Sequence, residues 1–167
     1  HDRLKVYLRD QGIAHDVIDA CLAMDGNDDF VSLVARAKAL QAFLKTDDGE
    51  NLVQGFKRAN NILTAEETKD GVFYEMDPDP KYAEDASETA LFDALAAAKP
   101  EISAAVTAET FEAAMGQMAG LRAPIDAFFE AVQINTDNQI VRRNRLCLLN
   151  QIRVTLGQIA DFTKLEG

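Results

Sequence analysis

Few side chains in this chain have the types and spacing that catalysis requires. Besides His1, the one histidine is His15, and the two cysteines, Cys21 and Cys147, lie far apart within apolar patterns. Zinc sites use three or four clustered ligands, and a nucleophile needs a base beside it. A glycine-rich phosphate loop is also absent from the sequence. The sequence therefore predicts no catalytic residue, no metal site and no cofactor in this domain, and free buried thiols at both cysteines.

One polar cluster has a composition suited to RNA. Lys57, Arg58 and Asn61 fall on the same side of a predicted helix, opposite its apolar face at about 100° per residue. Two cations and an amide on neighbouring turns can hold a phosphate or a base edge. The alternative is an ordinary solvent-exposed surface whose charged side chains bind nothing in particular. We predict that these three residues contact RNA.

A second basic cluster lies in the last predicted helix. Arg142 and Arg153 are three helical turns apart and share one flank, and Arg143 projects further round toward solvent. These three arginines are predicted RNA contacts. Arg145 instead falls within the apolar stripe, where a charge must be paired. We therefore predict a structural role for Arg145, bonded to an acid such as Asp126 or to carbonyls at a helix end.

Aromatic side chains are relevant because the unstacked bases of single-stranded RNA stack on flat rings. Four phenylalanines have core spacing and are expected inside the protein, namely Phe56, Phe128, Phe129 and Phe162. Phe73 and Tyr74 fall in a predicted loop instead. These two rings are expected to be more accessible.

Helices must position these residues, because helical periodicity recurs along the chain and no alternation of period two is present. The pattern predicts an all-α fold, a helical bundle of about eight to nine helices in one domain spanning 1–167. Residues 70–83 contain glycine and an Asp-Pro-Asp-Pro run and are predicted to form the long loop. Pro100 is predicted to end one helix, and Thr64 with Glu67 to begin another as a capping box.

Further local expectations concern helix ends and the start of the chain. Pro124 is predicted to begin a helix in its first turn. The final helix is predicted from about 138 to 162, and residues 26–28 are predicted to form a turn. We interpret His1 as the remnant of an expression tag and expect the native chain to extend further back.

Charge is distributed unevenly along the chain. The net charge is −11, yet residues 64–112 carry 13 acids and 3 lysines, whereas residues 141–167 carry 5 cations and 2 acids. An acidic total argues against a general nucleic-acid binder, and we predict no DNA binding. A local basic face is nevertheless compatible with the acidic net charge.

No apolar run approaches the roughly 18 to 20 residues needed to cross a membrane, and no signal peptide is present. We expect a cytoplasmic protein without membrane contact.

Several segments resemble the C-terminal part of the bacterial glycyl-tRNA synthetase beta subunit. They are residues 3–12 (RLKVYLRDQG), 56–63 (FKRANNIL), 123–129 (APIDAFF) followed by Val132, 142–146 (RRNRL) with Leu148 and Leu149, and the ending 160–167 (ADFTKLEG). The resemblance covers essentially the whole chain, and the order of the motifs makes it specific. Departures are mild, since Thr163 and Leu165 stand where serine and isoleucine are expected.

The resemblance implies a role in protein synthesis. That family is a two-subunit ligase that joins glycine to its tRNA with ATP and magnesium. Its alpha subunit holds the adenylation centre and its beta subunit holds most tRNA contacts. The C-terminal part of the beta subunit is similar to the helical anticodon-binding domain of arginyl-tRNA synthetase. By resemblance, the motif residues of interest are Lys57, Arg58, Asn61, Arg142 and Arg145.

The leading hypothesis is therefore a tRNA-binding, anticodon-recognising domain without its own cofactor, whose parent enzyme uses ATP and magnesium. Its expected partners are glycine tRNA, the alpha subunit and the rest of the beta subunit. The competing hypothesis is a structural domain whose acidic surface docks other parts of the synthetase, with little RNA contact. The acidic net charge of −11 motivates that second hypothesis.

Overall fold

The computed structural model describes residues 2–24 and 29–166. Within them lie eight α-helices and two short 3-10 helices: α1 Asp2–Asp10, α2 His15–Leu22, α3 Phe30–Leu44, α4 Asp47–Asp70, η1 Pro80–Tyr82, α5 Ala86–Thr107, α6 Phe111–Ala119, α7 Arg122–Ala131, α8 Gln139–Leu156 and η2 Phe162–Lys164. No strand occurs in the described residues, so the all-α prediction is confirmed. His1 and the predicted turn at 26–28 lie outside the described residues.

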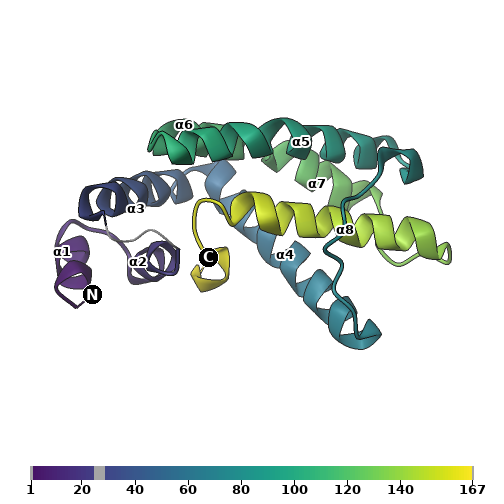
Figure 1. Cartoon of the computed structure of the whole chain (residues 1–167), viewed down its shortest axis with the longest axis horizontal. Helices are drawn as coiled ribbons and strands as arrows, with labels where there is room; N and C mark the ends of the chain where they lie inside the picture. The colour runs from purple at the N-terminus through teal and green to yellow at the C-terminus, as the bar shows by residue number, and fades with distance from the viewer. Residues whose placement is uncertain (1, 25–28, 167) are drawn as a thin grey trace.

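Helices α4 and α8 form the centre of the bundle. Figure 1 shows α4 running obliquely past α8. Helices α5 and α6 extend along the top edge of the molecule in this view. The packing is tight where α4 meets α7, because a Cβ on Gly55 would lie 3.1 Å from the Ile125 side chain. The start of α8 and the end of α4 both lie toward the same end of the molecule, where the loop between α4 and α5 also runs (Figure 1).

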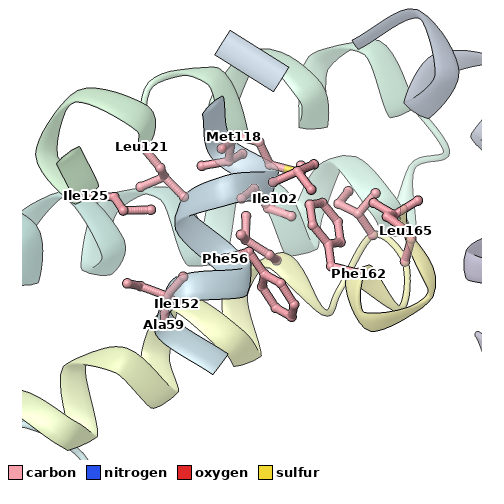
Figure 2. Close-up of a cluster of buried hydrophobic side chains, with 14 of the residues drawn as sticks. Phe56, Ala59, Ile102, Met118, Leu121, Ile125, Ile152, Phe162 and Leu165 are labelled. Atoms are coloured by element: carbon pink, nitrogen blue, oxygen red, sulfur yellow. The ribbon is translucent and has the colours of Figure 1, made fainter. Parts of the chain in front are cut away.

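The hydrophobic core joins helices that are distant in sequence. Phe56 on α4 and Phe162 on η2 are both nearly inaccessible, and their ring centroids lie 5.3 Å apart. Figure 2 shows Ile102, Met118 and Ile152 in the same cluster. Burying each such side chain contributes roughly 1.5–3 kcal/mol. The predicted burial of the four phenylalanines is confirmed, since each is at most 9% exposed.

Two predicted helix ends are wrong, for one physical reason. Pro100 lies inside α5, and Thr64 and Glu67 lie inside an uninterrupted α4. Local signals such as a proline or a capping pair compete with the burial of a continuous apolar face. In α5 that face includes Leu95 and Ile102, which lie on either side of the proline and are both buried. Packing therefore outweighs the hydrogen bond that the proline removes.

The remaining helix ends follow recognisable chemistry. Pro124 lies in the first turn of α7, as predicted. Helix α8 begins after Asn138, whose side-chain oxygen accepts hydrogen bonds from the Ile140 and Val141 amides at 3.0 and 3.2 Å. It ends at Leu156, earlier than predicted, with Gly157 at the C-cap. The chain then returns through η2 to the core.

Both cysteines are buried and free, as predicted. Burial raises the pKa of the Cys21 thiol to about 12, with a smaller opposing effect from Arg36. A thiol with so high a pKa is almost entirely protonated near neutral pH and is a weak nucleophile.

No helix among the described residues has the length and apolar character to span a bilayer.

Candidate nucleic-acid interface

Arg142 lies at the centre of an ion-pair network near the start of α8. Its Nη2 atom lies 3.1 Å from Glu66 and 2.8 Å from Asp70, two acids near the end of α4. The guanidinium also donates to the Tyr74 hydroxyl at 3.2 Å and to the Asn135 side chain at 2.9 Å. Only 11% of the side chain is exposed. Arg142 therefore joins α8, α4 and two loops.

The same network perturbs the titration of its acids. Hydrogen bonding from Arg142 lowers the pKa of Glu66, and hydrogen bonds from Tyr74 and Arg142 lower the pKa of Asp70. Burial, together with the hydrogen bond to Asp70, raises the pKa of Tyr74. Tyr74 is only 8% exposed, so the expectation that its ring would be accessible is wrong. The Tyr74 hydroxyl instead holds the loop against α4 and α8 through its hydrogen bonds with Asp70 and Arg142.

Arg153 occupies the flank predicted from its spacing with Arg142, and that flank faces α4. Its Nη2 atom lies 3.3 Å from Glu67 and donates to the Asn150 side chain at 2.8 Å. Glu67 is only 7% exposed. Arg142 and Arg153 were both predicted to contact RNA, yet their guanidinium groups are bonded within the protein. Sequence periodicity missed this, because it treats acids such as Glu66 and Glu67 as solvent-facing.

Arg145 is buried and paired, but not with the predicted acid. It donates to Glu88 Oε1 through Nε at 3.2 Å and Nη2 at 2.8 Å, and to the Gln133 carbonyl at 2.6 Å. Glu88 is fully buried. The proposed pairing with Asp126 is wrong, because Asp126 lies at the surface of α7, 3.4 Å from Arg122. The second predicted kind of partner, a carbonyl near a helix end, is present at Gln133, just beyond α7.

Arg143 has a different environment from its neighbours on α8. It is exposed, as expected, and lies beside the loop that follows α4. We use the name loop edge for five exposed residues of this loop and of the start of α8: Phe73, Met76, Tyr82, Ile140 and Arg143. All of them except Phe73 line one cavity. Phe73 is 75% exposed, which confirms the expectation of an accessible ring. The sequence did not indicate that Tyr82 and Ile140 would join it.

The loop is held against α8 by a pair of hydrogen bonds. The Asp79 amide donates to Asn144 Oδ1 at 2.7 Å, and Asn144 Nδ2 donates to the Asp79 carbonyl at 3.1 Å. At its start, Gly71 ends α4 with a φ of 70°, a conformation that favours glycine. The accessible rings of the loop edge are thus carried on a segment anchored at both Tyr74 and Asp79.

The cluster predicted on α4 forms a second surface, which we call the α4 face: Lys57, Arg58 and Asn61. Asn61 and Arg58 are exposed and Lys57 is half-buried, opposite the buried side of α4. The Arg58 guanidinium lies 4.6 Å from the centroid of the Phe129 ring. This stacking orients the guanidinium while leaving the residue exposed. RNA contact by the α4 face stays a prediction.

The described residues hold no group of three or more histidine, cysteine or acidic side chains arranged to bind a metal ion. The features that the structure does assemble are rings, cations and amides on anchored backbone. Such groups bind other molecules by stacking, ion pairing and hydrogen bonding. The geometry therefore describes a helical binding module.

Comparison with known proteins places this module in a family. A model of the DALR anticodon binding domain matches residues 52–166. The match spans more than half of the chain and includes most of α4, the loop edge and α8. The chain belongs to the DALR anticodon-binding domain family.

Longer proteins contain closely similar sequences. A glycine–tRNA ligase beta subunit from Ruegeria sp. (strain TM1040) is 65% identical over 167 residues, which is 100% of this chain and 24% of that protein. The corresponding proteins from Paracoccus denitrificans (strain Pd 1222) and Rhodospirillum centenum (strain ATCC 51521 / SW) are 62% and 45% identical over 167 residues, covering 24% and 23% of their lengths. The chain spans about a quarter of the length of these relatives.

Proposed function

We propose that this chain binds the anticodon arm of glycine tRNA as one domain of a glycine–tRNA ligase beta subunit. Two findings support the proposal: the family match over residues 52–166 and relatives named as beta subunits of that ligase. In this role the domain holds tRNA while ATP and magnesium are used elsewhere in the parent enzyme. Its partners are the alpha subunit and the remainder of the beta subunit, in the cytoplasm.

The exposed side chains of the loop edge are the main structural support for the proposed RNA binding. The Phe73 ring is 75% exposed, and a partner that covers it removes its apolar surface from water, which is favourable. Unstacked bases of an RNA loop are such partners, and stacking on an aromatic side chain contributes roughly 1–3 kcal/mol per base. Arg143 is exposed and lines the same cavity as Tyr82, so it can reach a phosphate or a base edge.

Acidic residues limit how many phosphates the domain can hold. The loop carries Glu75, Asp77 and Asp79 near the loop edge, and carboxylates repel phosphate. Arg142 and Arg153 are bonded to acids of α4, so we assign them to support of the loop and helices. Among the cations predicted to contact RNA, we assign Arg143 and the two on the α4 face to that contact. Base stacking therefore supplies much of the affinity.

This arrangement predicts a shallow salt dependence of tRNA binding. About three phosphate contacts give a slope of roughly −2 to −3 for log K against log salt. Arg143→Glu should weaken binding at least about tenfold at low salt, since it removes one cation and adds a repulsive charge. Fluorescence anisotropy with labelled glycine tRNA measures both quantities.

The matched control is Lys38→Glu, the same charge reversal at an exposed position on α3, away from both surfaces. It should change the affinity far less than Arg143→Glu. The competing proposal, a docking domain with little RNA contact, is favoured instead if no tRNA binding is measurable at low salt. Equal effects of the two reversals would also count against a specific interface.

A further inference from the structure

A cavity of about 220 Å³ lies within the loop edge, between the loop after α4 and the N-terminal half of α8. Pockets for drug-sized ligands are typically about 300–1,000 Å³, so this cavity suits a smaller, single ring system. Tyr82, Met76 and Ile140 supply its apolar walls, and all three are exposed. Such walls can contact the faces of a planar ring.

Some of the polar groups that line the cavity form hydrogen bonds that hold the loop in place. Asn144 uses both its oxygen and its nitrogen on the backbone of Asp79. The Asp79 carboxylate accepts a hydrogen bond from the Lys81 amide at 3.0 Å and lies 3.8 Å from Lys81 Nζ. These groups fix the shape of the cavity wall and are poorly placed to recognise a ligand.

Asp77 and Arg143 are the two charged side chains of the cavity whose polar atoms are available to a ligand. Neither side chain forms a hydrogen bond or ion pair with another residue in the parts of the chain that the structure describes. Both act on one neighbour, Cys147: its thiol pKa is raised mainly by burial, while Arg143 lowers it and Asp77 raises it. An acceptor-only group and a donor-only group thus border the same small cavity.

We infer that this cavity binds one unstacked nucleobase that carries an amino group beside a ring acceptor, which describes cytosine, adenine and guanine but not uracil. The inference rests on the proposed tRNA binding and specifies its ligand. The Asp77 carboxylate can only accept, so it requires an N–H of the base, which an exocyclic amino group supplies beside the ring acceptor. The Arg143 guanidinium can only donate, so it requires a ring nitrogen or carbonyl. Uracil also offers one N–H, but carbonyls flank it on both sides, so a carboxylate bonded there is repelled by the carbonyl that Arg143 does not bond.

RNA hairpins that share one stem and differ only in the loop test this assignment. One hairpin has a loop of cytidines, a second of adenosines and a third of uridines. The intact chain should bind the cytidine and adenosine hairpins about tenfold more tightly than the uridine hairpin, as for discrimination by a well-placed polar pair. Anisotropy titrations at one salt concentration give the three dissociation constants.

Asp77→Asn separates base recognition from general affinity. Its amide both donates and accepts, so the preference over uridine should fall to near onefold. Glu75→Gln, the same neutralisation at an exposed loop position outside the cavity lining, should retain the preference. Equal binding of the three hairpins, retained preference in Asp77→Asn, or no measurable hairpin binding overturns the inference. Intact tRNA run in parallel shows whether tRNA binding itself has failed.

Discussion

Replacing Glu88 by alanine is expected to lower the free energy of unfolding by about 3–5 kcal/mol, because it removes the buried acid that pairs with Arg145 and leaves only the exposed Glu84 carboxylate, 3.6 Å away. Glu88 is fully buried, and its Oε1 atom accepts both hydrogen bonds that Arg145 donates to it. The same oxygen accepts from the amides of Glu84 and Asp85 at 3.3 and 3.2 Å. The substitution therefore also removes part of the N-terminal cap of α5. Urea unfolding followed by circular dichroism measures the loss.

Two variants control this experiment. Asp126→Ala removes a surface partner of Arg122, whose side chain is 36% exposed, and should cost less than about 1 kcal/mol. The double variant Glu88→Leu with Arg145→Met removes both charges and should recover most of the stability lost in Glu88→Ala. A Glu88→Ala protein as stable as the Asp126→Ala protein would show that the buried pair is not formed in solution.

Arg142→Met is the second substitution with a large expected effect. It leaves Glu66, an acid with an 11% exposed side chain, without its arginine, which should cost about 1–3 kcal/mol. It also releases Tyr74 and Asn135, so amide exchange in the loop after α4 should become faster. Hydrogen exchange read by mass spectrometry, together with urea unfolding, measures both effects.

The acid dependence of stability distinguishes loss of this network from general destabilisation. Folding lowers the pKa values of Glu66 and Asp70 below their ordinary values of 4.5 and 3.8. A lowered folded-state pKa contributes stability that is present above the ordinary pKa and is lost as the pH falls through the folded one. The wild-type protein should therefore lose stability below about pH 4.5 more steeply than Arg142→Met does. Arg143→Met, at the exposed neighbouring position, should match wild type in stability and slope.

The burial of Arg145 could be predicted from sequence, whereas its partner could not. Its position in the apolar stripe of α8 placed it in the core, and the structure agrees. The partner, Glu88, is 57 residues away in sequence, and nothing local marks it as buried. Asp126 was nearer in sequence and lies on the surface. Pairing across a helical bundle depends on how helices pack, which periodicity does not encode.

The loop after α4 shows the same limit at the candidate interface. Composition located it correctly between α4 and α5. Sequence did not distinguish its two adjacent aromatic residues, yet Phe73 is 75% exposed and Tyr74 is 8% exposed. The difference arises because the Tyr74 hydroxyl donates to Asp70 at 2.5 Å and accepts from Arg142 at 3.2 Å. Likewise, Arg142, Arg143 and Arg153 were all predicted to contact RNA, and their partners in the structure separate Arg142 and Arg153 from Arg143.

Site-specific photocrosslinking tests most directly whether the loop edge is the surface that contacts tRNA. A benzophenone side chain is placed at Phe73, which is 75% exposed, and separately at Val31 on α3, which is 76% exposed. The two positions match in accessibility and differ in surface. Irradiation with glycine tRNA should give an RNA adduct at position 73 and little at position 31. Equal yields at the two positions, or no adduct at position 73 while tRNA is bound, would contradict the assignment of the interface to the loop edge.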